Sequence, residues 1–90
     1  MTKREFICDM GFPEAVVFDG PDYDDAIIGV TDDGRVVYDY DKMVESFAQR
    51  NGVPEEEAME FIDYNAIRAI PYAGPHAPVV MYPFREEDLA

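Results

Sequence analysis

The sequence has few of the residues that most enzymes use: one cysteine, one histidine, one serine and no tryptophan in 90 residues. A single cysteine excludes a disulfide within the chain and a cysteine-rich metal knuckle, and it fits a reducing compartment. A nucleophilic triad needs a histidine beside a serine or cysteine, and nothing in the sequence orients His76 toward Cys8. We therefore expect a protein that is not an enzyme and uses no cofactor.

Long apolar runs are also missing. No stretch approaches the roughly 20 apolar residues of a membrane-spanning helix, and the N-terminus, MTKREF, has no apolar targeting region. These absences predict a cytoplasmic protein that does not contact a membrane.

Basic residues are scarce, because 7 lysines and arginines face 20 aspartates and glutamates, for a net charge of -13. Between Arg4 and Arg35 the chain holds nine carboxylates and no basic residue. Such self-repulsion destabilises a compact state, so the acidity serves either solubility or recognition of a basic partner. Direct binding to nucleic acid or to anionic lipid is disfavoured by the same charge.

Hydrophobic residues make up 48% of the chain and aromatic residues 13%, more than a disordered acidic tail would contain. A chain of this length builds one core rather than two. We predict a single domain over residues 1–90, in which residues 1–12 and 84–90 are less ordered than the body.

Short β-branched runs predict strands at residues 15–18 and 79–82, and a hairpin that joins residues 26–30 to residues 35–38. In the hairpin turn, Gly34 can take the positive φ that a short connection needs.

Helical spacing follows the hairpin. Asp39 or Asp41 would cap a helix that starts near Lys42 and ends at Asn51–Gly52, and Pro54 suits the first turn of a second helix. The second helix has an expected buried arc of five residues: Ala58, Phe61, Ile62, Ala66 and Ala69.

Three prolines in residues 71–78 then favour an extended loop. These elements predict an α+β fold in the order β-β-β-α-α-β, with a small three- to four-stranded, mostly antiparallel sheet and two helices packed on one of its faces.

Two residues interrupt the pattern of the second helix. Asn65 falls within the apolar arc, so we expect a structural polar group of the core whose buried amide is bonded to backbone. Ile67 falls on the acidic side near Glu60 and Asp63, where it would join Tyr64 as an anchor for a protein contact or a homodimer.

Acidic residues crowd near the predicted hairpin, and three interpretations are open. They form a solvated, turn-forming segment, a weak Ca²⁺ or Mg²⁺ site, although the spacing is not that of an EF-hand, or a surface that binds a basic protein. For the third, the expected partner-binding residues are Asp19, Asp22, Asp24, Asp25, Asp32, Asp33, Glu60, Asp63, Tyr64 and Ile67.

The chain from Ala15 to Tyr82, above all IDYNAIRAIPY at residues 62–72 and the segment at residues 23–29, resembles a family of small acidic bacterial and phage-associated proteins whose function is not known. The resemblance implies no reaction, cofactor or catalytic residue. By size and charge, such proteins are similar to inhibitors of host nucleases of the anti-CRISPR and anti-restriction kind. We therefore expect an acidic interaction protein, and keep a structural or dimerisation module as the alternative.

Overall fold

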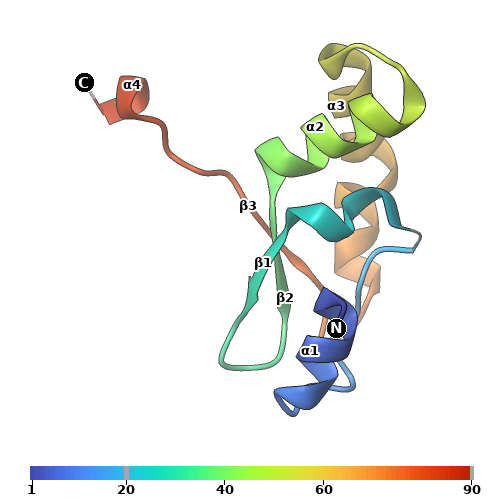
Figure 1. Ribbon diagram of the computed structural model, residues 1–90, viewed down its shortest axis with the longest axis vertical. Helices are drawn as coiled ribbons and strands as arrows, with labels where there is room; N and C mark the ends of the chain where they lie inside the picture. The colour runs from blue at the N-terminus through green and yellow to red at the C-terminus, as the bar shows by residue number, and fades with distance from the viewer. Residues whose placement is uncertain (20, 90) are drawn as a thin grey trace.

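The computed structural model describes residues 1–19 and 21–89 (Figure 1). In chain order its elements are helix α1 (Lys3–Asp9), 3₁₀-helix η1 (Pro21–Ala26), strands β1 (Ile27–Val30) and β2 (Val36–Asp39), helices α2 (Tyr40–Asn51) and α3 (Glu55–Asn65), 3₁₀-helix η2 (Ile67–Tyr72), strand β3 (Val79–Met81) and helix α4 (Glu86–Leu89). The fold is α+β, as predicted.

The sheet is mixed, which corrects the prediction of a mostly antiparallel one. Its strand order is β1-β2-β3, and β1 pairs with β2 in the predicted antiparallel hairpin. Strand β3 runs parallel to β2, with Tyr38 opposite Val80. A parallel pair needs a long crossover, and α2, α3 and η2 provide it.

The predicted strand at residues 15–18 is wrong, since this segment has no regular secondary structure. Its backbone N–H groups donate to a loop carbonyl and to a side chain instead of to a neighbouring strand. The Val16 N–H donates to the His76 carbonyl at 3.2 Å, and the Phe18 N–H donates to the Tyr38 hydroxyl at 3.1 Å. A β-branched run favours a pleated, half-buried surface, but a strand also requires a neighbouring strand.

Helix α2 confirms the local signals at both of its ends. The Asp39 carboxylate accepts from the Lys42 N–H at 3.1 Å, so Asp39 rather than Asp41 is the N-cap. Gly52 ends the helix in the left-handed region with a φ of 64°.

The buried stripe of α3 is narrower than predicted. Ala58, Ile62 and Ala66 are buried in the i, i+4 row, but 46% of Phe61 is exposed and Ala69 is also exposed. The α-helix ends at Asn65 and, after Ala66, a 3₁₀-helix begins at Ile67. An α-helix turns about 100° per residue, whereas a 3₁₀-helix turns about 120°. The buried face that was predicted with α-helical spacing is therefore rotated away from the true buried face after Asn65.

This change of phase also corrects the expectation for Ile67. Its side chain is partly buried against the core instead of lying on the acidic side. The extended loop predicted for residues 71–78 begins later, because Pro71 and Tyr72 belong to η2.

The N-terminal segment, expected to be less ordered, contains α1. The Thr2 hydroxyl accepts from the Glu5 N–H at 3.1 Å and caps this helix, and Ile7 lies in the core, 5% exposed. At the other end, α4 has no buried residue and the tail extends away from the body (Figure 1). The lower order expected at residues 1–12 and 84–90 stays a prediction, and Ala90 lies outside the described residues.

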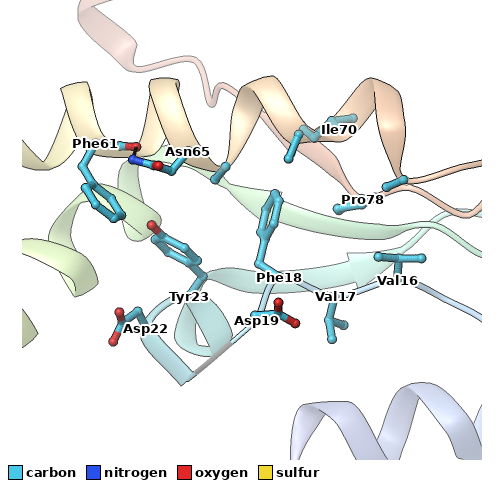
Figure 2. Close-up of a pocket in the computed structure, with 13 residues that line it drawn as sticks. Val16, Val17, Phe18, Asp19, Asp22, Tyr23, Phe61, Asn65, Ile70 and Pro78 are labelled. Atoms are coloured by element: carbon cyan, nitrogen blue, oxygen red, sulfur yellow. Dashed lines mark hydrogen bonds between the residues drawn. The ribbon is translucent and has the colours of Figure 1, made fainter.

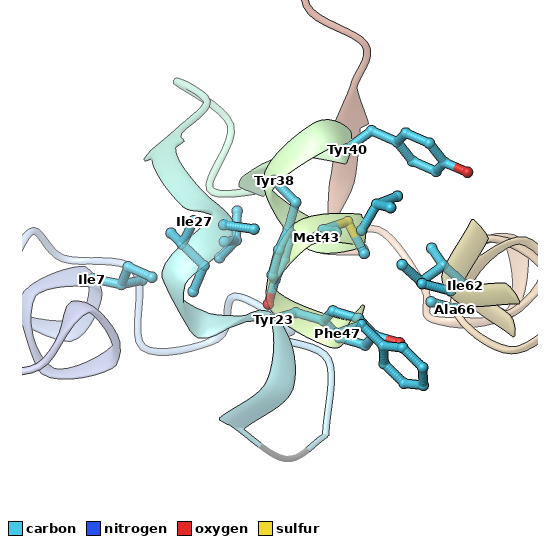
Figure 3. Close-up of a cluster of buried hydrophobic side chains, with 13 residues drawn as sticks. Ile7, Tyr23, Ile27, Tyr38, Tyr40, Met43, Phe47, Ile62 and Ala66 are labelled. Carbon is cyan, nitrogen blue, oxygen red and sulfur yellow. The ribbon is translucent and has the colours of Figure 1, made fainter. Parts of the chain in front are cut away.

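One hydrophobic cluster joins the elements (Figure 3). Tyr38 and Val36 of β2, Met43 of α2 and Ile62 of α3 are among its fully buried members. The hairpin and both central helices therefore share a core. No helix in the part of the chain that the structure describes is long and apolar enough to cross a bilayer.

Candidate functional site

The 3₁₀-helix η1, which carries Asp22, Asp24 and Asp25, packs against helix α2. The Ser46 hydroxyl donates to the Asp22 carbonyl at 2.7 Å and ties the two elements together. Asp25 and Glu45 line one shallow hollow between η1 and α2, together with Lys42. We call the side chains of Asp22, Asp25 and Glu45 the η1–α2 acidic surface.

Helix α1 brings two basic residues to η1 that the sequence places outside the acidic span. The Arg4 guanidinium pairs with the Asp24 carboxylate at 2.9 Å and also donates to the Phe18 carbonyl at 2.9 Å. This hydrogen bond to Asp24 raises the pKa of Arg4. Lys3 Nζ donates to the carbonyls of Asp25 and Ile27, at 3.0 and 2.8 Å. Asp24 is therefore engaged within the molecule, whereas no ion pair among residues 1–19 and 21–89 includes Asp22 or Asp25.

The remaining predicted acidic residues do not join this surface. Asp32 and Asp33 occupy the hairpin turn, and the Asp33 carboxylate accepts from the Thr31 hydroxyl. The turn and η1 lie at opposite ends of β1. These two carboxylates are therefore separated from the η1–α2 acidic surface by the length of a strand.

Helix α3 carries its own acidic face. Glu60 and Asp63 are exposed, and the Asp63 carboxylate accepts from the Tyr40 hydroxyl at 2.9 Å. Burial, with a smaller effect of this hydrogen bond, raises the pKa of Tyr40 to about 12. The exposed ring of Tyr64 lies under the Arg68 guanidinium at 4.9 Å, where a cation–π contact holds it.

The expectation of a buried amide at Asn65 is wrong. Its side chain is exposed, and Nδ2 donates to the Phe61 carbonyl one turn earlier at 3.0 Å. Asn65 and Phe61 both lie one position before the buried i, i+4 row of α3. They consequently face a groove rather than the core.

That groove was not predicted, and it is the main hollow beside the acidic residues (Figure 2). It has a volume of about 480 Å³ and separates residues 16–19 and η1 from α3 and η2. Its lining residues are Val16, Val17, Phe18, Asp19, Asp22, Tyr23, Phe61, Asn65, Ala66, Ala69, Ile70, Ala73 and Pro78. Most are apolar, and two carboxylates lie at the η1 side. No sequence signal links these segments, because they are brought together only by the fold.

An aromatic stack forms one end of the groove. Tyr23 packs edge-on against Phe18 with ring centres 5.8 Å apart, and it is stacked on Phe47 at 6.1 Å. Phe47 in turn stacks on Phe61 at 4.6 Å. Burial, with a contribution from the Asp22 charge, raises the pKa of Tyr23 to about 12. The hydroxyl therefore stays protonated at neutral pH, so this wall of the groove carries no charge on Tyr23.

A second groove, of about 430 Å³, lies between α1 and strand β1 and includes no carboxylate among its lining residues. Phe6, Met10 and Ile28 contribute exposed apolar side chains to it. Strand β1 is also an edge of the sheet. This surface is apolar although the molecule as a whole is strongly acidic.

The described residues offer no cluster for a metal ion, since no three or more histidine, cysteine or acidic side chains among them gather closely enough. The Ca²⁺ or Mg²⁺ interpretation therefore gains no structural support. Cys8 is exposed on α1, and His76 Nε2 lies 3.6 Å from a Glu14 carboxylate oxygen.

Comparison of the chain with protein-family models, with curated proteins and with solved structures gives no match.

Proposed function

We propose that this protein is a non-enzymatic, cytoplasmic interaction protein whose η1–α2 acidic surface binds a basic surface of another protein. One observation carries the proposal. Asp22, Asp25 and Glu45 lie on two elements packed against each other, and no ion pair within the described residues neutralises their carboxylates. Burying them against lysine and arginine side chains would relieve the self-repulsion of a molecule with a net charge of -13.

The favoured class of partner is a nucleic-acid-binding protein, such as a nuclease with a basic channel. Such channels supply lysine and arginine to meet the phosphate charge of a nucleic acid. A folded protein that displays carboxylates along adjoining helices offers those residues an alternative anion. The size and net charge of the chain are similar to those of acidic inhibitors of host nucleases, and this analogy is what suggests a role as a nucleic-acid mimic.

Competition with DNA tests this function. The immobilised protein is incubated with host lysate, and duplex DNA is added to displace the bound material. We expect the captured proteins to be basic, to be released by DNA and to be released by salt. The double variant Asp25→Asn/Glu45→Gln should lose them, because it neutralises the acidic surface.

The matched control is Glu56→Gln/Glu57→Gln, which removes the same charge from the first turn of α3. It should retain the captured proteins. Equal loss in both variants would show that only net charge matters, and capture that resists DNA and salt would contradict the proposal.

A dimerisation module is the second candidate, and the apolar groove between α1 and β1 favours it. Ile67 is packed against the core, so the surface we consider for self-association is the sheet edge with the exposed side chains of Phe6, Met10 and Ile28. Sedimentation velocity over a range of concentrations and salt measures this. A dimer that forms through this surface should strengthen with salt and be lost in Phe6→Ser.

A further inference from the structure

The groove between η1 and α3 combines apolar walls with an acidic edge, and its polar groups are mainly hydrogen-bond acceptors. We propose that it binds a peptide segment in which an aromatic or large aliphatic side chain stands next to an arginine. This inference rests on the proposed function, because it specifies which part of a basic partner the protein recognises.

The walls of the groove are mostly apolar and favour an apolar side chain in the ligand (Figure 2). Phe61 is 46% exposed although its ring belongs to the aromatic stack, and opposite the 16–19 segment the small side chains of Ala66 and Ala69 leave room. The volume of about 480 Å³ lies within the range of pockets that bind small ligands. One large apolar side chain with its neighbouring backbone would fill this space.

The polar atoms at the groove favour a cationic group in the ligand. Asp22 contributes a carboxylate that none of the ion pairs among the described residues includes. Asp19 contributes a second one, whose charge also acts on Arg4. The lining residues themselves include no lysine, arginine or histidine. Asn65 uses its Nδ2 for the Phe61 carbonyl, which leaves its side-chain oxygen to accept a bond. A ligand that matches several acceptors needs several donors. Arginine has five N–H donors and no acceptor, and it keeps its charge at any physiological pH.

Charge also argues against other occupants. An acidic segment, including the tail of a second copy with Glu86, Glu87 and Asp88, would meet the carboxylates of Asp19 and Asp22. A purely apolar segment would cover these carboxylates without replacing the hydrogen bonds that water makes to them. A segment with an apolar residue beside arginine satisfies both parts of the groove.

The absence of tryptophan from this chain provides a direct assay. The probe is acetyl-Arg-Trp-Arg-amide, whose tryptophan is the only one in solution, and the control probe is acetyl-Glu-Trp-Glu-amide. On titration with the full protein, the arginine probe should show a saturable shift of emission to shorter wavelength, weakened by added salt. The glutamate probe should show none. No shift with the arginine probe, or an equal shift with both probes, would overturn the inference.

Three variants locate the binding. Ala69→Phe places a ring in the groove at an exposed position and should abolish the shift, and Asp22→Asn should weaken binding roughly two- to fivefold, as expected for an exposed ion pair. Glu56→Gln removes the same charge outside the groove and should bind as the wild type does. An unchanged response in Ala69→Phe, with its circular dichroism intact, would contradict the proposed location.

The outcomes separate this inference from the proposed function. If Asp25→Asn/Glu45→Gln loses the DNA-displaced proteins while Ala69→Phe retains them and the probe does not bind, the acidic surface functions and the groove does not. If the probe binds in the groove but no basic protein is captured, the groove inference holds and the proposed function is wrong.

Discussion

At the scale of single residues, the buried tyrosines show how the environment sets the chemistry of a side chain. Tyr38 is fully buried, and its hydroxyl accepts from the Phe18 N–H. The hydroxyl of Tyr40 donates to Asp63. Burial raises the pKa of both side chains, and that of Tyr23 as well. Tyrosine thus serves as a hydrogen-bond acceptor at Tyr38, as a donor at Tyr40 and as part of a groove wall at Tyr23.

These shifts predict a loss of stability at alkaline pH. Burial raises the pKa of Tyr23 and of Tyr40 to about 12 in the folded protein, from the ordinary tyrosine value of 10. Between these values the unfolded chain loses protons that the folded protein keeps, so the tyrosines favour unfolding increasingly as pH rises. Their contribution to stability is complete below pH 10 and disappears as pH approaches about 12.

Urea denaturation at several pH values across this window measures the effect. Tyr40→Phe removes one titrating group and should flatten the decline in the free energy of unfolding. Tyr72→Phe is the control, because 89% of its side chain is exposed and its hydroxyl loses little water on folding. A decline that is equally steep in Tyr40→Phe would contradict the assignment.

At the scale of elements, the ends of helix α2 were predictable because they depend on neighbouring residues in the chain. The sequence left Asp39 and Asp41 open as the N-cap. The structure selects Asp39, whose carboxylate bonds to the Lys42 N–H, while Asp41 pairs with Arg85 at 3.0 Å. Both carboxylates lie near the same helix end but they have different partners.

This difference gives a prediction for two matched substitutions. Asp39→Ala should lower the free energy of unfolding by about 1 kcal/mol, because it removes a helix cap. Asp41→Ala should cost less, because an exposed ion pair contributes about 0 to 1 kcal/mol. Urea denaturation of both variants provides the comparison, and a larger loss in Asp41→Ala would show that the cap has been assigned to the wrong residue.

Elements that depend on distant parts of the chain were less predictable. The run at residues 15–18 has the composition of a strand, yet its bonds go to His76 and to the Tyr38 side chain. The pattern of α3 was correct at Ala58, Ile62 and Ala66 but not at Phe61 and Asn65. Periodicity locates the centre of a buried face, whereas the packed neighbours determine its width.

At the scale of the whole molecule, arginine side chains pair with only a few of the acidic side chains among the described residues. Arg4 pairs with Asp24, and Arg85 pairs with Asp41 and, at 3.8 Å, with Glu87. All three pairs are partly or largely exposed to solvent. Such pairs stabilise a fold by little, so repulsion among the other carboxylates should dominate the electrostatic free energy of the folded state.

Added sodium chloride should consequently raise the melting temperature, because screening weakens repulsion between carboxylates. Circular dichroism melts over a series of salt concentrations measure this effect. Binding to a basic partner should weaken over the same series, so the two responses have opposite signs. A melting temperature that stays flat or falls would mean that the Arg4–Asp24 and Arg85–Asp41 pairs outweigh the repulsion.

The sequence by itself determined the features that local chemistry controls: the α+β class, the hairpin around Gly34, the end of α2 at Gly52, the choice of Asp39 or Asp41 for its N-cap, and a strongly acidic chain with a normal hydrophobic content. Turn residues, caps and apolar spacing act over a few residues, and for that reason they can be recognised in the chain alone.

Only the tertiary structure decided the rest. It placed Arg4 on Asp24, aligned β3 parallel to β2, and brought Phe18 and Phe61 to one groove beside Asp22. These contacts join residues far apart in the sequence, and they form because one shared core holds all the segments at the same time. The position of a charge or a ring in space, which binding requires, is a property of that core and not of any local pattern.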